Sequence, residues 1–124
     1  MLERVVLAAH DRLLGAHGGA TGLRDAGLLD SALARPRQHY SYGSPDVFEL
    51  AALYTAGIVR NHPFADGNKR TGFAIGIAFL ELNGFSFQAA EEDATQKVFA
   101  LAADELDEAG YAAWLRSNAR RRRQ

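Results

Sequence analysis

Two stretches of the chain, residues 46–61 and 68–82, carry apolar side chains on nearly every face of a helix. Apolar residues recur in both at spacings of three and four, which predicts α-helices, and helices that are apolar all round are normally buried. We therefore expect a central buried helix pair, with the other segments packed around it. The small residues that would let the two backbones approach closely are Ala51, Ala52, Ala56, Gly57, Gly72, Ala74, Gly76 and Ala78.

The rest of the chain also favours helices, because no segment shows a convincing alternation of β-branched residues. Residues 85–87 are expected to be extended, and residues 36–45, rich in turn formers, to be a loop or short flap. The predicted fold class is all-α, a compact bundle of about six helices forming a single domain over residues 1–124. The outer helices are expected at residues 1–15, 25–34, 91–106 and 107–119.

Composition excludes several classes of protein. The chain has no cysteine, which excludes disulfides, thiolate metal sites and a cysteine nucleophile. A net charge of −1 argues against direct nucleic-acid binding, and Arg120–Arg123 is expected to be a solvated tail. No apolar run approaches the roughly 20 residues that span a bilayer, and the start lacks a signal-peptide pattern. We therefore expect a soluble, cytoplasmic protein without membrane contact.

The segment that joins the two apolar helices is densely polar. Within nine residues it carries an imidazole (His62), a carboxylate (Asp66), an ammonium (Lys69) and a guanidinium (Arg70). Phosphate transfer needs a base, a carboxylate for Mg²⁺, and cations with backbone N–H groups to hold the phosphates. Because Gly67 precedes a predicted helix, its first N–H groups would form an anion site.

These polar residues also have simpler interpretations. Asp66-Gly67-Asn68 could be a simple turn, but a turn does not explain two cations at a helix N-terminus, where positive charge is unfavourable. A bound anion would explain them. The other histidines have no partner at metal-ligand spacing and are interpreted as structural or surface groups: His10, His17 and His39.

The segment His62-Pro-Phe-Ala-Asp-Gly-Asn-Lys-Arg70 resembles the signature loop of the Fic/Doc family. Residues 22–33 and Pro36 resemble the N-terminal region of its Doc-type, or death-on-curing, branch. The resemblance implies a transferase that uses ATP and Mg²⁺. It implies these roles: His62 as the catalytic base for a protein hydroxyl, Asp66 as the Mg²⁺ ligand, Phe64 as the loop anchor, and Gly67, Asn68, Lys69 and Arg70 as phosphate-binding residues.

Lys69 separates two activities within the family. Adenylyl-transferring members usually carry Gly at this place, whereas Doc-type members carry Lys and transfer the γ-phosphoryl group. Lys69 therefore favours a protein kinase activity. Gly67 stands where the Doc loop has Ala, and Pro63 is common among adenylyl transferases, so AMP transfer is the alternative. A non-catalytic binding module with the same fold is a third hypothesis, which the intact loop disfavours.

Resemblance also implies partners. The Doc-type target is elongation factor Tu, whose modification would stop translation. The chain has no inhibitory Ser/Thr-x-x-x-Glu-Gly/Asn motif, so restraint is expected from a separate antitoxin protein. Residues 38–43 correspond to a flap that would align the target, with Tyr40 and Tyr42 giving apolar contacts; an ordinary surface loop is the alternative.

Overall fold

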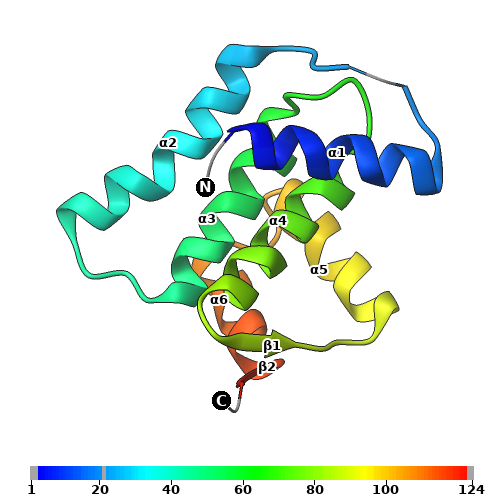
Figure 1. Cartoon of the computed structure of the whole chain (residues 1–124). Coiled ribbons are helices and arrows are strands. Elements are labelled where there is room, and N and C mark those ends of the chain that lie inside the picture. Colours follow the sequence, from blue (N-terminus) through cyan, green and yellow to red (C-terminus); the bar gives the residue numbers. More distant parts are fainter. Residues whose placement is uncertain (1–2, 21, 123–124) are drawn as a thin grey trace.

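The computed structural model describes residues 3–20 and 22–122, and leaves the side chains of residues 41 and 42 undescribed (Figure 1). Helices dominate it, which confirms the predicted all-α class, and one short pair of strands is added. In chain order the elements are α1 (Glu3–His17), α2 (Ala26–Tyr42), α3 (Val47–Asn61), α4 (Asn68–Leu82), β1 (Phe85–Phe87), α5 (Glu91–Ala102), α6 (Glu108–Ser117) and β2 (Ala119–Arg121).

The helices α3 and α4 lie side by side in the middle of the molecule, as predicted (Figure 1). Their close approach depends on glycine. A Cβ at Gly72 would lie 2.7 Å from Val59 Cγ1, and one at Gly76 would lie 2.3 Å from Thr55 Oγ1. The Thr55 hydroxyl donates a hydrogen bond of 2.8 Å to the carbonyl of Gly72 and joins the two helices. A methyl group at either glycine would therefore push the helices apart.

Two clusters of buried side chains flank this central pair. On one side α6 contributes Tyr111 and Trp114, and Trp114 Nε1 donates to Asp93 of α5 at 2.8 Å. On the other side α1 and α2 contribute Val6 and Leu29, both fully buried. In the described part of the chain, no helix combines the length and apolar character required for a membrane crossing.

The prediction of a loop at residues 36–45 is wrong, because α2 continues through Pro36 as far as Tyr42. Proline removes one helical hydrogen bond and costs about 3 kcal/mol in a helix interior. Packing outweighs that cost here. Pro36 is buried, and the helix is held against α3 where Ala32 meets Gly57, whose added Cβ would lie 2.9 Å from the Ala32 Cβ.

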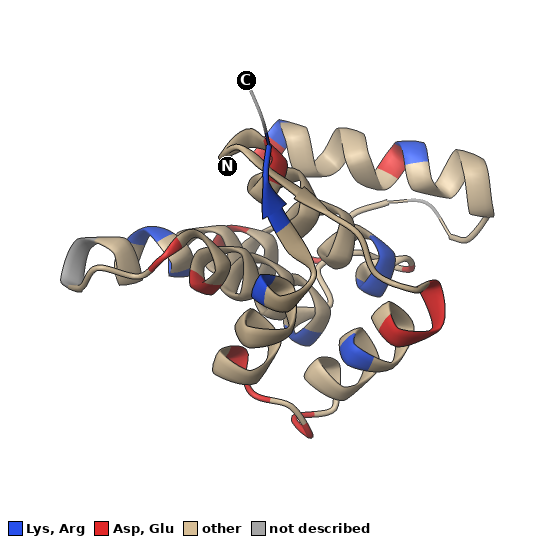
Figure 2. Ribbon diagram, turned by 90° about the horizontal axis from the view of Figure 1, so that it is seen from below, with Lys and Arg blue, Asp and Glu red and all other residues tan. Residues whose placement is uncertain are grey.

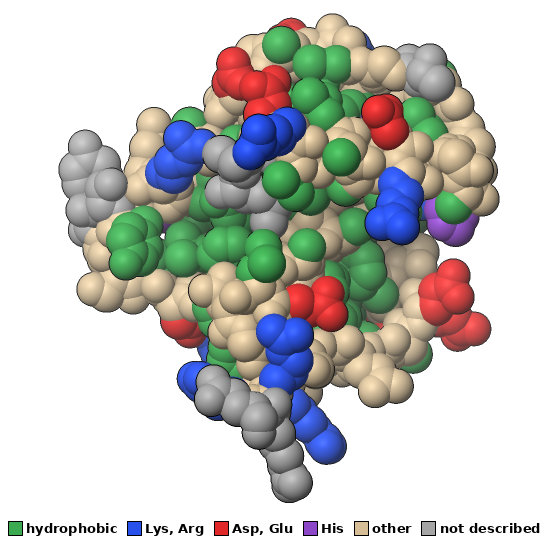
Figure 3. Space-filling model, in the orientation of Figure 1, with side chains coloured by type: hydrophobic (Ala, Val, Ile, Leu, Met, Phe, Trp, Pro, Cys, Tyr) green, Lys and Arg blue, Asp and Glu red, His purple; other side chains and the backbone are tan. Residues whose placement is uncertain are grey.

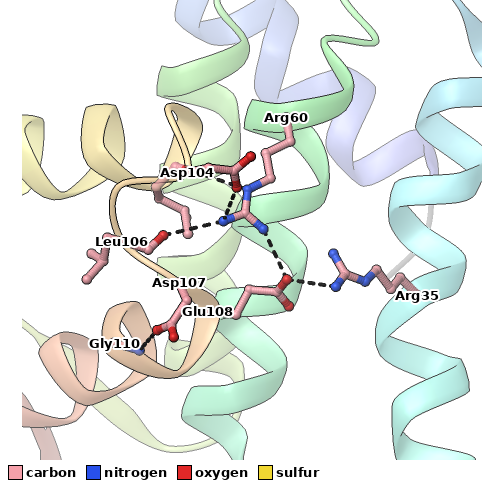
Figure 4. A network of polar contacts seen from close by, with 8 residues as sticks. Arg35, Arg60, Asp104, Leu106, Asp107, Glu108 and Gly110 are labelled. Atoms are coloured by element: carbon pink, nitrogen blue, oxygen red, sulfur yellow. Dashed lines mark hydrogen bonds and ion pairs between the residues drawn. The ribbon is translucent and has the colours of Figure 1, made fainter.

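The helix expected over residues 91–106 ends early, at Ala102, because a polar network forms at that point (Figure 4). Arg60 on α3 donates to the carbonyls of Leu101 at 3.1 Å and Leu106 at 3.4 Å. Its guanidinium also pairs with Asp104 and Glu108, each at 3.0 Å. The guanidinium of Arg60 therefore provides donors for carbonyl groups at and just beyond the end of α5. It also links α3 to the start of α6 through Glu108.

The arginines at residues 120 and 121 are exposed to solvent, as expected, but they belong to a strand rather than a tail, since residues 119–121 form β2. β2 pairs antiparallel with β1, with Phe85 opposite Arg121 and Phe87 opposite Ala119. The backbone of β1, which was correctly predicted as extended, thereby gains hydrogen-bond partners. Figure 2 shows the basic residues along β2, and Figure 3 shows Lys and Arg side chains gathered at the C-terminal end of the molecule. Arg123 lies outside the described residues.

Candidate active site

The polar segment predicted as the site begins where α3 ends. His62 caps α3 in the left-handed conformation, with φ 52° and ψ 56°, and its N–H donates to Ile58 at 3.1 Å. This backbone conformation costs about 1–2 kcal/mol for a residue other than glycine, and such strain is concentrated at functional sites. The turn leaves the His62 side chain exposed beside a pocket.

The segment before α2 holds this turn through main-chain hydrogen bonds. The carbonyl of Pro63 accepts from the N–H groups of Arg24 at 2.6 Å and Asp25 at 3.0 Å. The N–H of Ala65 donates to Gly22 at 3.2 Å. Residues 22–25 and 63–65 therefore run together, as Figure 1 shows for the two loops at one end of the molecule.

Arg24 adds a side-chain clamp that the sequence did not reveal. Its Nε donates to the carbonyl of His62 at 2.8 Å, and Nη2 donates to the carbonyl of Asn61 at 3.1 Å. A cation at the C-terminus of α3 also suits the helix dipole. Residues 22–33 resemble those of Doc-type chains, but no spacing in the sequence connects Arg24 with a residue 38 positions away.

Phe64 and Asn68 close the loop on itself. Phe64 is 1% exposed, and its main chain forms both hydrogen bonds of the Asn68 amide, one to Oδ1 and one from Nδ2, each at 3.0 Å. Asn68 is buried as well. Its side chain thus holds the loop, so any anion contact from this residue falls to its backbone N–H at the start of α4.

A second missed residue, His10 on α1, also contacts the loop. Of the two predicted interpretations, structural or surface, its burial supports the structural one, since His10 is 2% exposed. Its ring stacks on Phe64 with centroids 3.8 Å apart and planes at 8°, and its Nε2 lies 2.7 Å from the carbonyl oxygen of Asp66. The 56 residues that separate the two partners explain why no local pattern indicated this contact.

A pocket of about 1090 Å³ lies over the loop and between α1, α4 and α5. Its apolar wall comes mainly from α4 and α5, and includes Phe73, Ile77, Val98 and Phe99. Six of the residues predicted for the site line it together: His62, Asp66, Gly67, Asn68, Lys69 and Arg70.

Positive charge and hydrogen-bond donors lie together at the N-terminus of α4. Gly67 begins this helix with φ 77° and provides no side-chain cap, so the first N–H groups have no partner within the helix. Arg70 is exposed beside them, and Lys69 places its Nζ 4.9 Å from the ring centroid of Phe99 on α5. An anion bound here would meet the positive end of the helix and two cations.

The proposed flap does not join this group. Tyr40 is 68% exposed in the last turns of α2, and it is not among the residues that line the pocket. Figure 1 shows the end of α2 on the opposite side of the molecule from the loop. The backbone of Tyr42 belongs to α2, but its side chain lies outside the described residues.

The fold and the pocket define an all-helical protein in which the imidazole of His62 and the N-terminus of α4 line the same pocket. A family model, the Fic/DOC family, matches residues 2–80, which include the whole loop. The chain therefore belongs to the Fic/Doc family. It is 44% identical over 77 residues to the Toxin Doc of Mycolicibacterium smegmatis, a match that covers 60% of this chain and 58% of that protein.

Proposed function

We propose that this chain is a Doc-type toxin that transfers the γ-phosphoryl group of ATP to a Ser or Thr hydroxyl of a host protein. The observation that carries the proposal is that His62 and the first turn of α4 line one pocket, so a base and an anion site face the same space. The similarity to a protein named Toxin Doc supports the toxin class. Elongation factor Tu is the proposed target, by the family resemblance alone.

Mg²⁺ fits the residues that are present. Asp66 Oδ1 accepts from the N–H of Gly67 at 2.8 Å, which leaves Oδ2 without a hydrogen-bond partner among residues 3–20 and 22–122. Gly19 lies next to this oxygen, and any side chain there would crowd it, since a Cβ would lie 2.8 Å from Oδ2. That part of the chain has no group of three His, Asp or Glu side chains that could hold a metal. Asp66 would therefore share Mg²⁺ with nucleotide phosphates, and the ion would offset their charge.

Different residues of the chain have different roles in the phosphoryl transfer. His62 accepts the proton of the target hydroxyl as its oxygen attacks the γ-phosphorus. The bond from that phosphorus to the β,γ-bridging oxygen breaks, and ADP leaves with the electron pair. Arg70, Lys69 and the free N–H groups of α4 stabilise the phosphate charge throughout.

AMP transfer is the second candidate, because Pro63 and Gly67 are the residues that the loop shares with adenylyl transferases. Lys69 argues against it. Its side chain reaches from the first turn of α4 towards Phe99, so it occupies space at the pocket mouth that a glycine would leave open. Lys69→Gly should therefore impair γ-phosphoryl transfer and favour AMP transfer.

A separate antitoxin is the proposed regulator. The sequence carries no internal inhibitory motif, and the relative is named as a toxin. We expect expression of this chain alone to arrest growth, and His62→Ala to abolish the arrest. Harmless expression of the unaltered chain would contradict the toxin proposal.

The experiment that tests the chemistry uses two parallel reactions with elongation factor Tu and Mg²⁺. One contains ATP labelled at the γ-phosphate and the other contains ATP labelled at the α-phosphate, each with a His62→Ala control. Label from the γ position alone, lost in the control, is the expected result. Label from the α position would establish AMP transfer instead, and no label from either would reject elongation factor Tu as the target.

A further inference from the structure

His10 is a buried imidazole that the transfer chemistry does not use. It lies on α1 and faces the loop, where it contacts the main chain of one functional residue and the ring of the loop anchor. Its Nε2 is 2.7 Å from the carbonyl oxygen of Asp66. A carbonyl oxygen can only accept, so Nε2 carries the proton and donates it.

This hydrogen bond controls the orientation of one peptide plane. The carbonyl of Asp66 and the N–H of Gly67 belong to the same trans peptide, so they point in opposite directions. His10 holds the carbonyl end, while Asp66 Oδ1 accepts from the N–H end at 2.8 Å. With both ends held, the carboxylate is tied down through Oδ1, and Oδ2 is kept for another partner.

The ring of His10 provides a second restraint. It lies flat on Phe64, with centroids 3.8 Å apart, and Phe64 is in turn bonded through its main chain to Asn68. A Cβ at Gly67 would lie 3.6 Å from His10 Nε2, so the imidazole lies beside the residue that precedes α4. The histidine therefore contacts the loop on both sides of Ala65.

We propose that His10 is a positioning residue, whose Nε2–H orients the Asp66–Gly67 peptide and so presents the Asp66 carboxylate for Mg²⁺ binding with the nucleotide. The inference rests on the proposed function, because it assigns His10 to the metal-binding part of that site. Residues that orient a metal ligand in this way change metal affinity by about 10–100-fold when they are altered.

Two substitutions separate the hydrogen bond from the stacking. His10→Phe keeps a flat ring against Phe64 but has no donor for the Asp66 carbonyl. His10→Gln can place an amide N–H near the position of Nε2 but cannot stack. His39→Gln, at an exposed position in the last turn of α2, is the matched control.

The measurement is calorimetric binding of the β,γ-imido analogue of ATP over a series of Mg²⁺ concentrations, with melting temperatures recorded for every variant. We expect His10→Phe to need about 10–100-fold more Mg²⁺ for the same nucleotide affinity. Its affinity without Mg²⁺ should stay close to that of the unaltered protein. His10→Gln should recover most of the Mg²⁺ response, and His39→Gln all of it.

Several results would overturn the inference. An unchanged Mg²⁺ response in His10→Phe would do so, as would equal loss of affinity with and without Mg²⁺, which indicates a general structural defect. Equal impairment of the Phe and Gln variants would also reject it. If His10→Phe does not fold, His10→Met, which also lacks a donor, takes its place. Failure of the unaltered protein to bind the analogue would instead reject the proposed function.

Discussion

The side chain of Asn68 forms two hydrogen bonds of 3.0 Å with the main chain of Phe64, one as acceptor and one as donor. The first residue of α4 is thereby tied to the middle of the loop that precedes it. Both residues are buried, so water cannot replace either bond. The loop thus owes its shape to a side chain that sequence interpretation had assigned to phosphate binding.

Asn68→Ala should therefore destabilise the protein strongly. It leaves the N–H and carbonyl of Phe64 buried and unpaired, and each such group costs about 1–3 kcal/mol. We expect the free energy of unfolding in urea to fall by about 2 kcal/mol or more. Asn83→Ala is the control, because it removes a single bond from an exposed amide to the carbonyl of Phe79. Equal losses for the two variants would contradict this account of the loop.

Arg24→Ala should reduce activity more than stability. It removes the hydrogen bonds to the carbonyls of Asn61 and His62 and so frees the strained cap of α3. Because the guanidinium is exposed, we expect a loss of about 1 kcal/mol in unfolding free energy, with a drop in phosphate transfer of about tenfold. Arg12→Ala, at an exposed position of α1, should change neither. Normal transfer by Arg24→Ala would show that the clamp is not needed.

Gly76→Ala and Gly15→Ala should shift stability in opposite directions. A Cβ at Gly76 would lie 2.3 Å from Thr55 Oγ1, so α3 and α4 must separate, at a cost of about 1–3 kcal/mol. A Cβ at Gly15 would meet nothing within 4 Å, and alanine in that helix should stabilise by about 0.5–1 kcal/mol. Thermal and urea unfolding of both variants measures the contrast. A stabilised Gly76→Ala protein would refute the close packing of the central pair.

Asp46 makes stability depend on pH at the start of α3. Burial of its carboxyl works against ionisation, but hydrogen bonds from the Glu49 N–H and from Arg116 outweigh it and hold the pKa below its ordinary value of 3.8. A lowered folded pKa stabilises the protein above the unfolded pKa, and this stabilisation is lost as pH falls through the folded value.

The variant Asp46→Asn keeps a capping side chain but cannot ionise. The unaltered protein should be the more stable of the two above about pH 4, with a constant difference. Below that pH the difference should shrink, when unfolding free energies are measured in urea from pH 6 to pH 2. A difference that does not change with pH would show that the carboxylate charge contributes nothing.

Much of the architecture was predictable because it depends on local pattern. The apolar residues of α3 and α4 recur at helical spacing, Asp46 and Asp25 are residue types that favour helix N-caps, and Asn83-Gly84 ends α4, with Gly84 at φ 91°. The incorrect predictions lie where distant parts of the chain meet. Packing on α3 carries α2 through Pro36, Arg60 ends α5 early, and β1 recruits Arg120 and Arg121 into a strand.

The sequence by itself determined which chemical groups occupy the loop from His62 to Arg70, since their identity and order are local facts. Only the tertiary structure decided what holds that loop. Arg24 and His10 reach it from 38 and 56 residues away, and Asn68 turns its amide to Phe64 rather than to the pocket. Such contacts depend on how helices pack, and packing brings together side chains whose separation along the chain carries no signal. The chemical groups of the site therefore follow from the local sequence, whereas their arrangement in space depends on the packing of the whole fold.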